Sequence, residues 1–277
     1  MRSLARLSSF VGLVGLAVAC GGEGEGGGDP GVNRGVPPPA GKDMRIREIA
    51  DPQSPNKAND LQDVAVSGAV VVAVDQFDET NNGRSRGTIY VQDLDATPEN
   101  AAYSAISLFA PSFVPGNLRV GAGDVLDLRG TYQETKTIGP TVTFAPGAPL
   151  PQLSQPIATF RFDAKTLPPR DIDVNDLKDY TTARKWLNML VRVKDVTLQR
   201  DAFASQPGAR VSAAILPGST GDACDGPFPK APVLVNELMD LNPLQLKKDT
   251  RIKSITGIVT YFCNFHIAPR SPADIER

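Results

Sequence analysis

Three stretches of the chain decide its fold: VSGAVVVAV (66–74), GTIYVQDL (87–94) and GDVLDLRGTY (123–132). The first is dense in β-branched residues, and the other two alternate apolar with polar side chains, which is typical of half-buried β-strands. Gly68 interrupts the first run at a point where a long strand would bend. The side chains predicted to face inward are Ile89, Val91, Leu126, Leu128 and Tyr132.

The neighbouring segments complete a set of five strands. Residues 105–109 predict a third strand, and residues 157–162 predict the strand that closes the set. Asn82-Gly83, between the first two stretches, is a hairpin signal. The segment 139–152 is rich in proline and predicts a loop or a short edge strand. This order of strands is that of the OB-fold, a small, partly open Greek-key barrel.

The second half of the chain repeats the pattern of the first. Long strands are predicted over 189–198 and over 252–261, and the later one again contains a glycine. Matching features recur at nearly equal offsets, which indicates one fold used twice. Gly130 and Gly257 are 127 positions apart, and the strand starts Val64 and Leu190 are 126 positions apart.

Two further features are predicted in this half. The inward positions of 189–198 change parity at Lys194-Asp195, which predicts a β-bulge with a one-residue slip. Leu177, Tyr180 and Leu187 recur at loosely helical spacing, so a short helix is predicted over 176–187. Trp186 is expected to pack over an open barrel end or between domains, and ligand stacking is the alternative.

Several motifs carry a resemblance to a known class of domain. Val66-Ser67-Gly68, Tyr90-Val91-Gln92-Asp93, the run 123–130 and the closing segment 265–275 resemble the OB-fold domains attached to secreted bacterial nucleases and related surface proteins. The resemblance implies an all-β fold of two tandem OB-fold-like barrels, and its motifs are structural. We expect the first barrel over 44–165, and a linker with the second barrel over 166–277.

The N-terminal segment has the features of an export signal. Arg2 and Arg6 precede ten apolar or small residues (10–19), which match a signal peptide and are too few to span a bilayer as a helix. Ala17-Val18-Ala19-Cys20 resembles the lipobox of bacterial lipoproteins, where the signal is removed just before a cysteine that receives lipid. The alternatives are an ordinary signal peptide cut elsewhere and a buried N-terminal helix.

A tether is predicted to follow Cys20. Residues 21–41 contain nine glycines and four prolines and almost nothing apolar, so 20–43 is expected to form a flexible linker. Gly21 stands where some inner-membrane lipoproteins carry aspartate, which favours the outer membrane of the cell envelope. We therefore expect an exported protein held at the membrane by the lipid on Cys20.

The other two cysteines, Cys224 and Cys263, form an even pair in a protein expected to be exported. An oxidising compartment favours a disulfide between them, which would close a loop of about 40 residues. A metal site is the competing interpretation. His266 is the only histidine, and no second pair of ligands stands at suitable spacing.

The sequence predicts no catalytic site, no metal and no cofactor. A Ser254–His266 pair lacks the Gly-x-Ser-x-Gly elbow of a hydrolase. Two acidic clusters have oxygen ligands suited to calcium, but both lack EF-hand spacing, so solvated loops are favoured. The first cluster comprises Asp75, Asp78, Glu79, Asn81 and Asn82, and the second Asp93, Asp95 and Glu99.

Charge bears on the choice of partner. The chain has a formal net charge of −2, and removal of Arg2 and Arg6 with the signal lowers it to −4. An acidic balance disfavours a dedicated nucleic-acid binder, and Tyr90 and Tyr132 are predicted in the core rather than on a stacking surface. The sequence therefore predicts a non-catalytic surface protein that binds or scaffolds an envelope component or an extracellular ligand. The alternative is an accessory nucleic-acid-binding lipoprotein that assists uptake or degradation of extracellular DNA.

Overall fold

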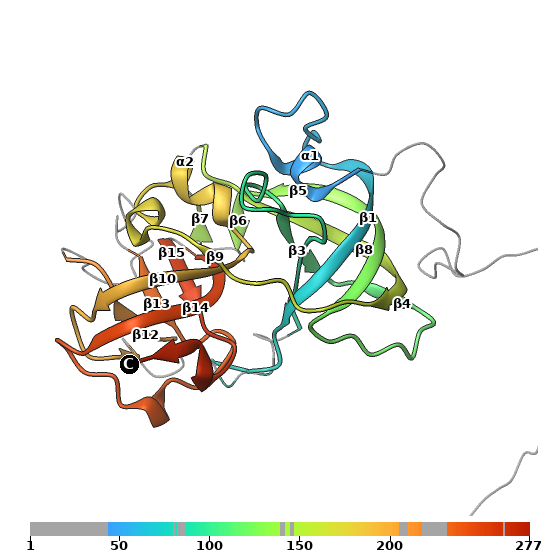
Figure 1. Ribbon diagram of the computed structural model, residues 1–277. Helices are drawn as coiled ribbons and strands as arrows, with labels where there is room; N and C mark the ends of the chain where they lie inside the picture. Colours follow the sequence, from blue (N-terminus) through green and yellow to red (C-terminus); the bar gives the residue numbers. More distant parts are fainter. Residues whose placement is uncertain are drawn as a thin grey trace, which may run out of the picture. The chain divides into compact units, whose positions relative to one another are not determined.

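Five strands form a closed barrel in the computed structural model, shown from blue to light green in Figure 1. They are β1 (Gln62–Val74), β2 (Ile89–Asp93), β3 (Ala105–Phe109), β5 (Asp124–Thr135) and β8 (Leu150–Asp163). They pair in the order β3-β2-β1-β5-β8, and parallel pairing of β3 with β8 closes the barrel. This is the strand order predicted from the sequence. The structure describes residues 44–79, 81, 83, 87–138, 142–144, 147–204, 210–217, 232–262 and 264–277.

The predicted bend in the first strand is confirmed. Gly68 has a φ of +70°, a conformation that favours glycine, and the pairing of β1 with β5 shifts between Val66 and Ala69. The bend lets one strand serve two sides of the barrel. The inward-facing set is also confirmed, because all of the predicted residues belong to the buried barrel core: Ile89, Val91, Leu126, Leu128 and Tyr132.

The closing strand is longer than predicted. β8 begins at Leu150 and not at residue 157, so the prediction of a loop over 139–152 is wrong at its C-terminal end. Pro156 is accommodated because pairing with β5 shifts there, between Arg129 and Thr131, as in a β-bulge. Gln155 has a φ of +47° at this irregularity. A proline at a bulge does not have to donate a ladder hydrogen bond, so the strand continues through it.

The second β unit repeats the strand order but is less closed. Its strands pair in the order β11-β12-β13-β15-β14-β10-β9, with β13 parallel to β15. β10 and β12 correspond to β1 and β2, but they are not paired in the described residues. Just beyond the end of β10, the Gln199 N–H donates to Ala214 O of β12 at 2.8 Å. The main strands are β10 (Leu190–Thr197), β12 (Val211–Ala214), β13 (Val233–Val235), β14 (Arg251–Phe262) and β15 (Asn264–Ala268).

The internal repeat is visible in the strand pairing. Val64 lies opposite Gly130 in the barrel, and Val191 lies opposite Gly257 in the second unit. Both pairs are therefore related by the same offset of 127 positions. Each glycine is also in close contact with the neighbouring strand. A Cβ atom would lie 2.9 Å from Pro156 Cα at Gly130 and 2.6 Å from Ala268 O at Gly257.

The predicted one-residue slip in β10 is wrong. The pairing of β10 with β14 keeps a constant register from Leu190 to Thr197. The buried positions do change parity, but they do so in both strands together: Val193 and Val196 are buried opposite Ile255 and Ile252. Asp195 takes a φ of +53° at that point. Because the parity changes at the same place in both strands, the register is kept without an extra residue.

The single helix predicted over 176–187 is three short ones: η1 (Val174–Leu177), α2 (Tyr180–Ala183) and η2 (Arg184–Trp186). Asp179 interrupts the run because its side chain accepts the Thr182 N–H at 3.0 Å and caps a new helix start. Trp186 packs against the core of the second unit, in agreement with the packing role predicted for it.

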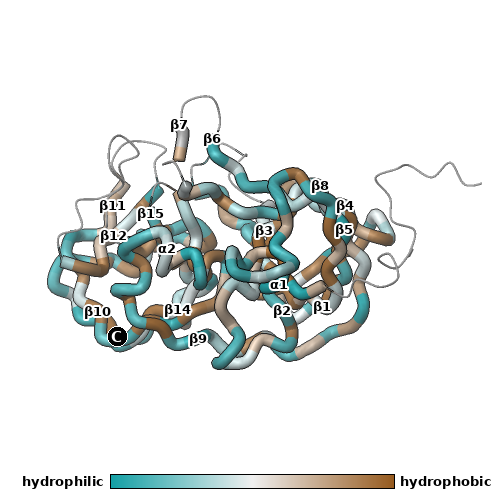
Figure 2. The backbone as a smooth tube through the Cα atoms, turned by 90° about the horizontal axis from the view of Figure 1, so that it is seen from above, coloured by the Kyte–Doolittle hydropathy of each residue, from teal (hydrophilic) through white to brown (hydrophobic). Residues whose placement is uncertain are grey.

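The remaining elements are short, and all described residues belong to one compact unit, Gly31–Arg277. In Figure 2, polar residues mark many of the turns and apolar residues follow strands such as β14. No helix in the described ranges has the length and hydropathy needed to cross a membrane. The short elements are α1 (Ile46–Ala50), β4 (Ser112–Val114), β6 (Thr137–Ile138), β7 (Val142–Thr143), β9 (Arg170–Asp171), β11 (Phe203–Ala204), η3 (Asn242–Leu244), η4 (Pro272–Asp274) and β16 (Ile275–Glu276).

Candidate functional site

The outer face of β2 and β3 is buried in this chain. Tyr90 and Gln92 point outward from β2, and Ala105 and Ser107 point outward from β3, since their neighbours in the strands fill the barrel core. None of the four is more than 7% exposed. In OB-folds, this face and the adjoining loops bind oligonucleotides and oligosaccharides. The face that would carry a ligand is therefore covered.

The second unit covers this face. One apolar cluster, which we call the shared face, contains residues of both units. The barrel contributes the C-terminal half of β1 together with Tyr90 and Val125, and the second unit contributes residues of β10, β13, β14 and β15. Its buried members are Val70, Val72, Ala73, Tyr90, Val125, Leu190, Val235, Leu238, Ile258 and Ala268.

A loop of the barrel also enters the second unit. Phe144 lies between β5 and β8, is buried, and belongs to the core of the second unit. Its ring centroid is 5.0 Å from that of Tyr261. This connection is one of the loops that contact ligands in OB-folds. Both the strand face and this loop are therefore used for packing within the chain.

A group of three buried acids and one half-buried arginine lies beside the shared face. Arg210 donates from Nε to Glu79 Oε1 at 2.8 Å and from Nη1 to Glu237 Oε2 at 3.2 Å. Glu237 also accepts hydrogen bonds from Tyr90 OH at 2.8 Å and from Thr260 Oγ1 at 2.7 Å. Asp75 is buried close by. We call Asp75, Glu79, Arg210 and Glu237 the interface charge cluster.

Burial and neighbouring charges shift the pKa values of this cluster. Burial, and then the carboxylates of Glu237 and Glu79, raise the pKa of Asp75 to about 7. Burial also raises the pKa of Glu79 against the opposing effect of Arg210. For Glu237, burial acts in the same direction, but Arg210 and the Thr260 hydrogen bond outweigh it and lower the pKa. Glu237 is thus the ionised partner of Arg210, and Asp75 carries a proton in mildly acidic conditions.

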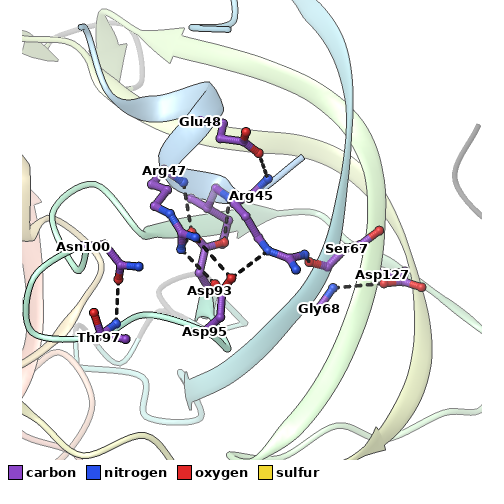
Figure 3. A network of polar contacts seen from close by, with 11 residues as sticks. Arg45, Arg47, Glu48, Ser67, Gly68, Asp93, Asp95, Thr97, Asn100 and Asp127 are labelled. Carbon is purple, nitrogen blue, oxygen red and sulfur yellow. Dashed lines mark hydrogen bonds and ion pairs between the residues drawn. The ribbon is translucent and has the colours of Figure 1, made fainter. Parts of the chain in front are cut away.

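Two members of the second predicted acidic cluster, Asp93 and Asp95, belong to a network of polar contacts at the start of α1 (Figure 3), whereas the third, Glu99, is exposed. The buried Asp93 carboxylate accepts the N–H groups of Ile46 at 2.7 Å and Arg47 at 3.1 Å, so it caps helix α1 from β2. Asp95 forms ion pairs with Arg45 at 3.2 Å and Arg47 at 2.8 Å. The prediction of a solvated loop is wrong for Asp93, because its carboxylate is buried and accepts the first N–H groups of α1.

The same prediction is wrong for part of the first acidic cluster. Asp75 and Glu79 are buried, because Glu79 pairs with Arg210 and both lie against the second unit. Asp78 Oδ2 accepts the Gly83 N–H at 2.5 Å. Within the described ranges, no three acidic, histidine or cysteine side chains are grouped so that they could hold a metal ion. Asn82 lies outside the described residues.

Ser254 and His266 do not form a catalytic pair. Ser254 Oγ donates to Glu276 Oε2 at 3.2 Å, and His266 Nε2 contacts Asn264 Oδ1 within its own strand β15. His266 is buried and acts electrostatically on Glu237. Tyr90 and Tyr132 are both buried, as predicted, although Tyr90 lies in the shared face and not in the barrel core. Cys20, Cys224 and Cys263 lie outside the described residues.

Sequence reasoning missed Arg210 and Glu237. One signal was present for Glu237, which is the only charged residue in the mostly apolar run VLVNELM (233–239). A carboxylate inside such a run needs a buried partner. Nothing local identifies Arg210 as that partner, because it is 27 residues away in sequence.

No protein-family model matches the chain, and no match was found among curated proteins or solved structures.

Proposed function

We propose that this chain is an exported, lipid-anchored envelope protein without catalytic activity, which binds or scaffolds an envelope component or an extracellular ligand. The order of segments carries the proposal: an apolar run of signal length, Cys20 after small residues, a tether, and then a folded body. The Cys20 thiol would form a thioether to a diacylglycerol, and further acylation would make the anchor stable.

The tether sets the reach of the body from the membrane. A Gly-rich coil of the 24 residues over 20–43 has a root-mean-square length of roughly 27 Å. The body begins at Met44, next to the Arg45–Asp95 and Arg47–Asp93 contacts that fix α1. Because these contacts fix α1 to the barrel, we expect the body to move relative to the membrane through the tether and not through its own first residues.

The alternative, accessory binding of nucleic acid, loses support from the burial of the β2–β3 face. The outward side chains of that face, among them Tyr90 and Ala105, are inaccessible to a stacking base. The mildly acidic net charge also argues against it. Retention of the protein on DNA that falls steeply with salt would favour this alternative again.

The test of the anchor is Cys20→Ser in cells fed a radiolabelled fatty acid. We expect the label to be lost and the precursor to stay uncleaved, because serine cannot form the thioether. Cys224→Ser makes the same side-chain change elsewhere and should keep the label. Unchanged labelling of Cys20→Ser would contradict the proposed anchor.

A further inference from the structure

The interface charge cluster contains more buried acid than base. Glu79 and Glu237 share the single guanidinium of Arg210, and Asp75 forms no ion pair among the described residues. With all four groups ionised, three negative charges face one positive charge. An unpaired charge is costly to bury, so a proton on the cluster relieves part of that cost.

Asp75 stands at the base of the loop that joins β1 to β2. Its N–H donates to Thr88 O at 2.8 Å, and its own carbonyl accepts the Gly87 N–H at 2.9 Å. Its Oδ1 accepts the Phe77 N–H at 3.1 Å. A change of charge on Asp75 therefore acts where both ends of the loop meet.

Glu79 joins the same loop to the second unit through one oxygen. Its Oε1 binds Arg210, whereas Oε2 is buried without a hydrogen-bond partner in the described part of the chain. Glu237 is held more firmly, by Arg210, Tyr90 and Thr260. If a further negative charge competes for Arg210, Glu79 is the partner that is released.

We propose that the interface charge cluster is a proton-linked contact, in which a proton on the cluster keeps the β1–β2 loop joined to the second unit and its loss weakens the Glu79–Arg210 pair. Among the residues that the structure describes, the charged and titratable groups that act on Asp75 are Glu79 from its own loop, Tyr90 from β2, and Arg210 and Glu237 from the second unit. His266 of β15 acts on Glu237. The inference is independent of the lipid anchor.

The direction of the pH effect follows from Asp75. Its pKa is about 7 in the folded protein and 3.8 in its ordinary state, with burial as the main cause. Between these values the folded state holds a proton that the unfolded state has lost. The stabilisation of the folded state by the proton on Asp75 is thus complete below about pH 4, and it is lost as the pH rises through about 7. The loop contact is weakest in neutral and alkaline solution.

The test is hydrogen–deuterium exchange of the full chain in detergent at pH 5.5 and 8.5, corrected for intrinsic exchange rates. In the wild type, we expect the protection of the Gly87 amide, which donates to Asp75 O, to fall about tenfold or more at the higher pH. Asp75→Asn should remove most of this change, because the amide has no proton to lose. Asp63→Asn, on the exposed part of β1, should behave as the wild type.

Two results would overturn the inference. One is a wild-type protection that is equal at both pH values, which decides the question even if Asp75→Asn does not fold. The other is an Asp75→Asn variant that keeps the wild-type pH dependence. Glu79→Gln offers a second route, since it should lower the protection at pH 5.5 by weakening the charged pair with Arg210.

Discussion

The barrel and the second β unit share one strand order, yet only the barrel has a core of its own. The barrel core draws all its buried residues from the range 46–158. The core of the second unit includes Ala101, Ala105 and Phe144, which come from the part of the chain that forms the barrel. The same strand order therefore gives one self-contained unit and one that depends on its neighbour.

The difference lies in how the first two strands of each unit pair. β1 and β2 pair antiparallel from Ala69 to Val74. Their counterparts β10 and β12 show no strand pairing in the described ranges, and the contacts to β12 come from Gln199 and Arg200, just beyond the end of β10. The weakly joined side needs other apolar cover, which the linker residues Leu177, Ala183 and Leu187 and the loop residue Phe144 supply. Incomplete closure of the second sheet thus ties the two halves together.

Separating the halves should have the largest effect. A fragment of residues 44–165 should unfold cooperatively, whereas 166–277 should show no cooperative transition, because its core lacks Ala101, Ala105 and Phe144. Thermal melts followed by near-ultraviolet circular dichroism would measure this. Mixing the fragments should restore the missing transition. A cooperative melt of 166–277 alone would contradict the comparison.

A single side chain tests the same dependence within the intact chain. Phe144→Ala should lower the free energy of unfolding by about 3 kcal/mol, because it leaves a cavity beside Tyr261. Urea denaturation would measure the change. Phe203→Ala is the matched control, since Phe203 is 46% exposed and its loss, which includes its contact with the Arg200 guanidinium, should change stability by about 1 kcal/mol or less. Equal effects would show that Phe144 is not part of the core.

The strands were predictable because their signals are local. Alternation placed Ile89, Val91 and Leu126 in the barrel core, and the glycine spacing revealed the repeat. The all-β fold and the barrel order follow from such signals. The extent of β8 did not, because a bulge accommodates Pro156 and bulges depend on the partner strand.

The candidate site was far less predictable. Tyr90 and Ala105 read as ordinary strand residues, and burial of their outer face depends on packing against a unit about 100 residues later. Likewise Asp75 and Glu79 read as loop acids until Arg210 is placed beside them. Pairings across domains leave no periodic trace in one sequence, so charge partners of this kind emerge only from the fold.

The two repeat glycines give the finest test of the comparison. At Gly257 a Cβ would meet Ala268 O at 2.6 Å and Ala268 C at 2.8 Å, whereas at Gly130 the nearest atoms are Pro156 Cα at 2.9 Å and Cβ at 3.0 Å. Both contacts are tight, but the one at Gly257 is closer, and its nearest atom is a backbone carbonyl oxygen. Gly257→Ala should therefore cost about 3 kcal/mol and Gly130→Ala about 1–2 kcal/mol in urea denaturation. Gly116→Ala is the control, since no atom lies within 4 Å of its Cβ position. If Gly130→Ala lowered stability more than Gly257→Ala, the fourth strand would be more tightly packed in the barrel (β5) than in the second unit (β14).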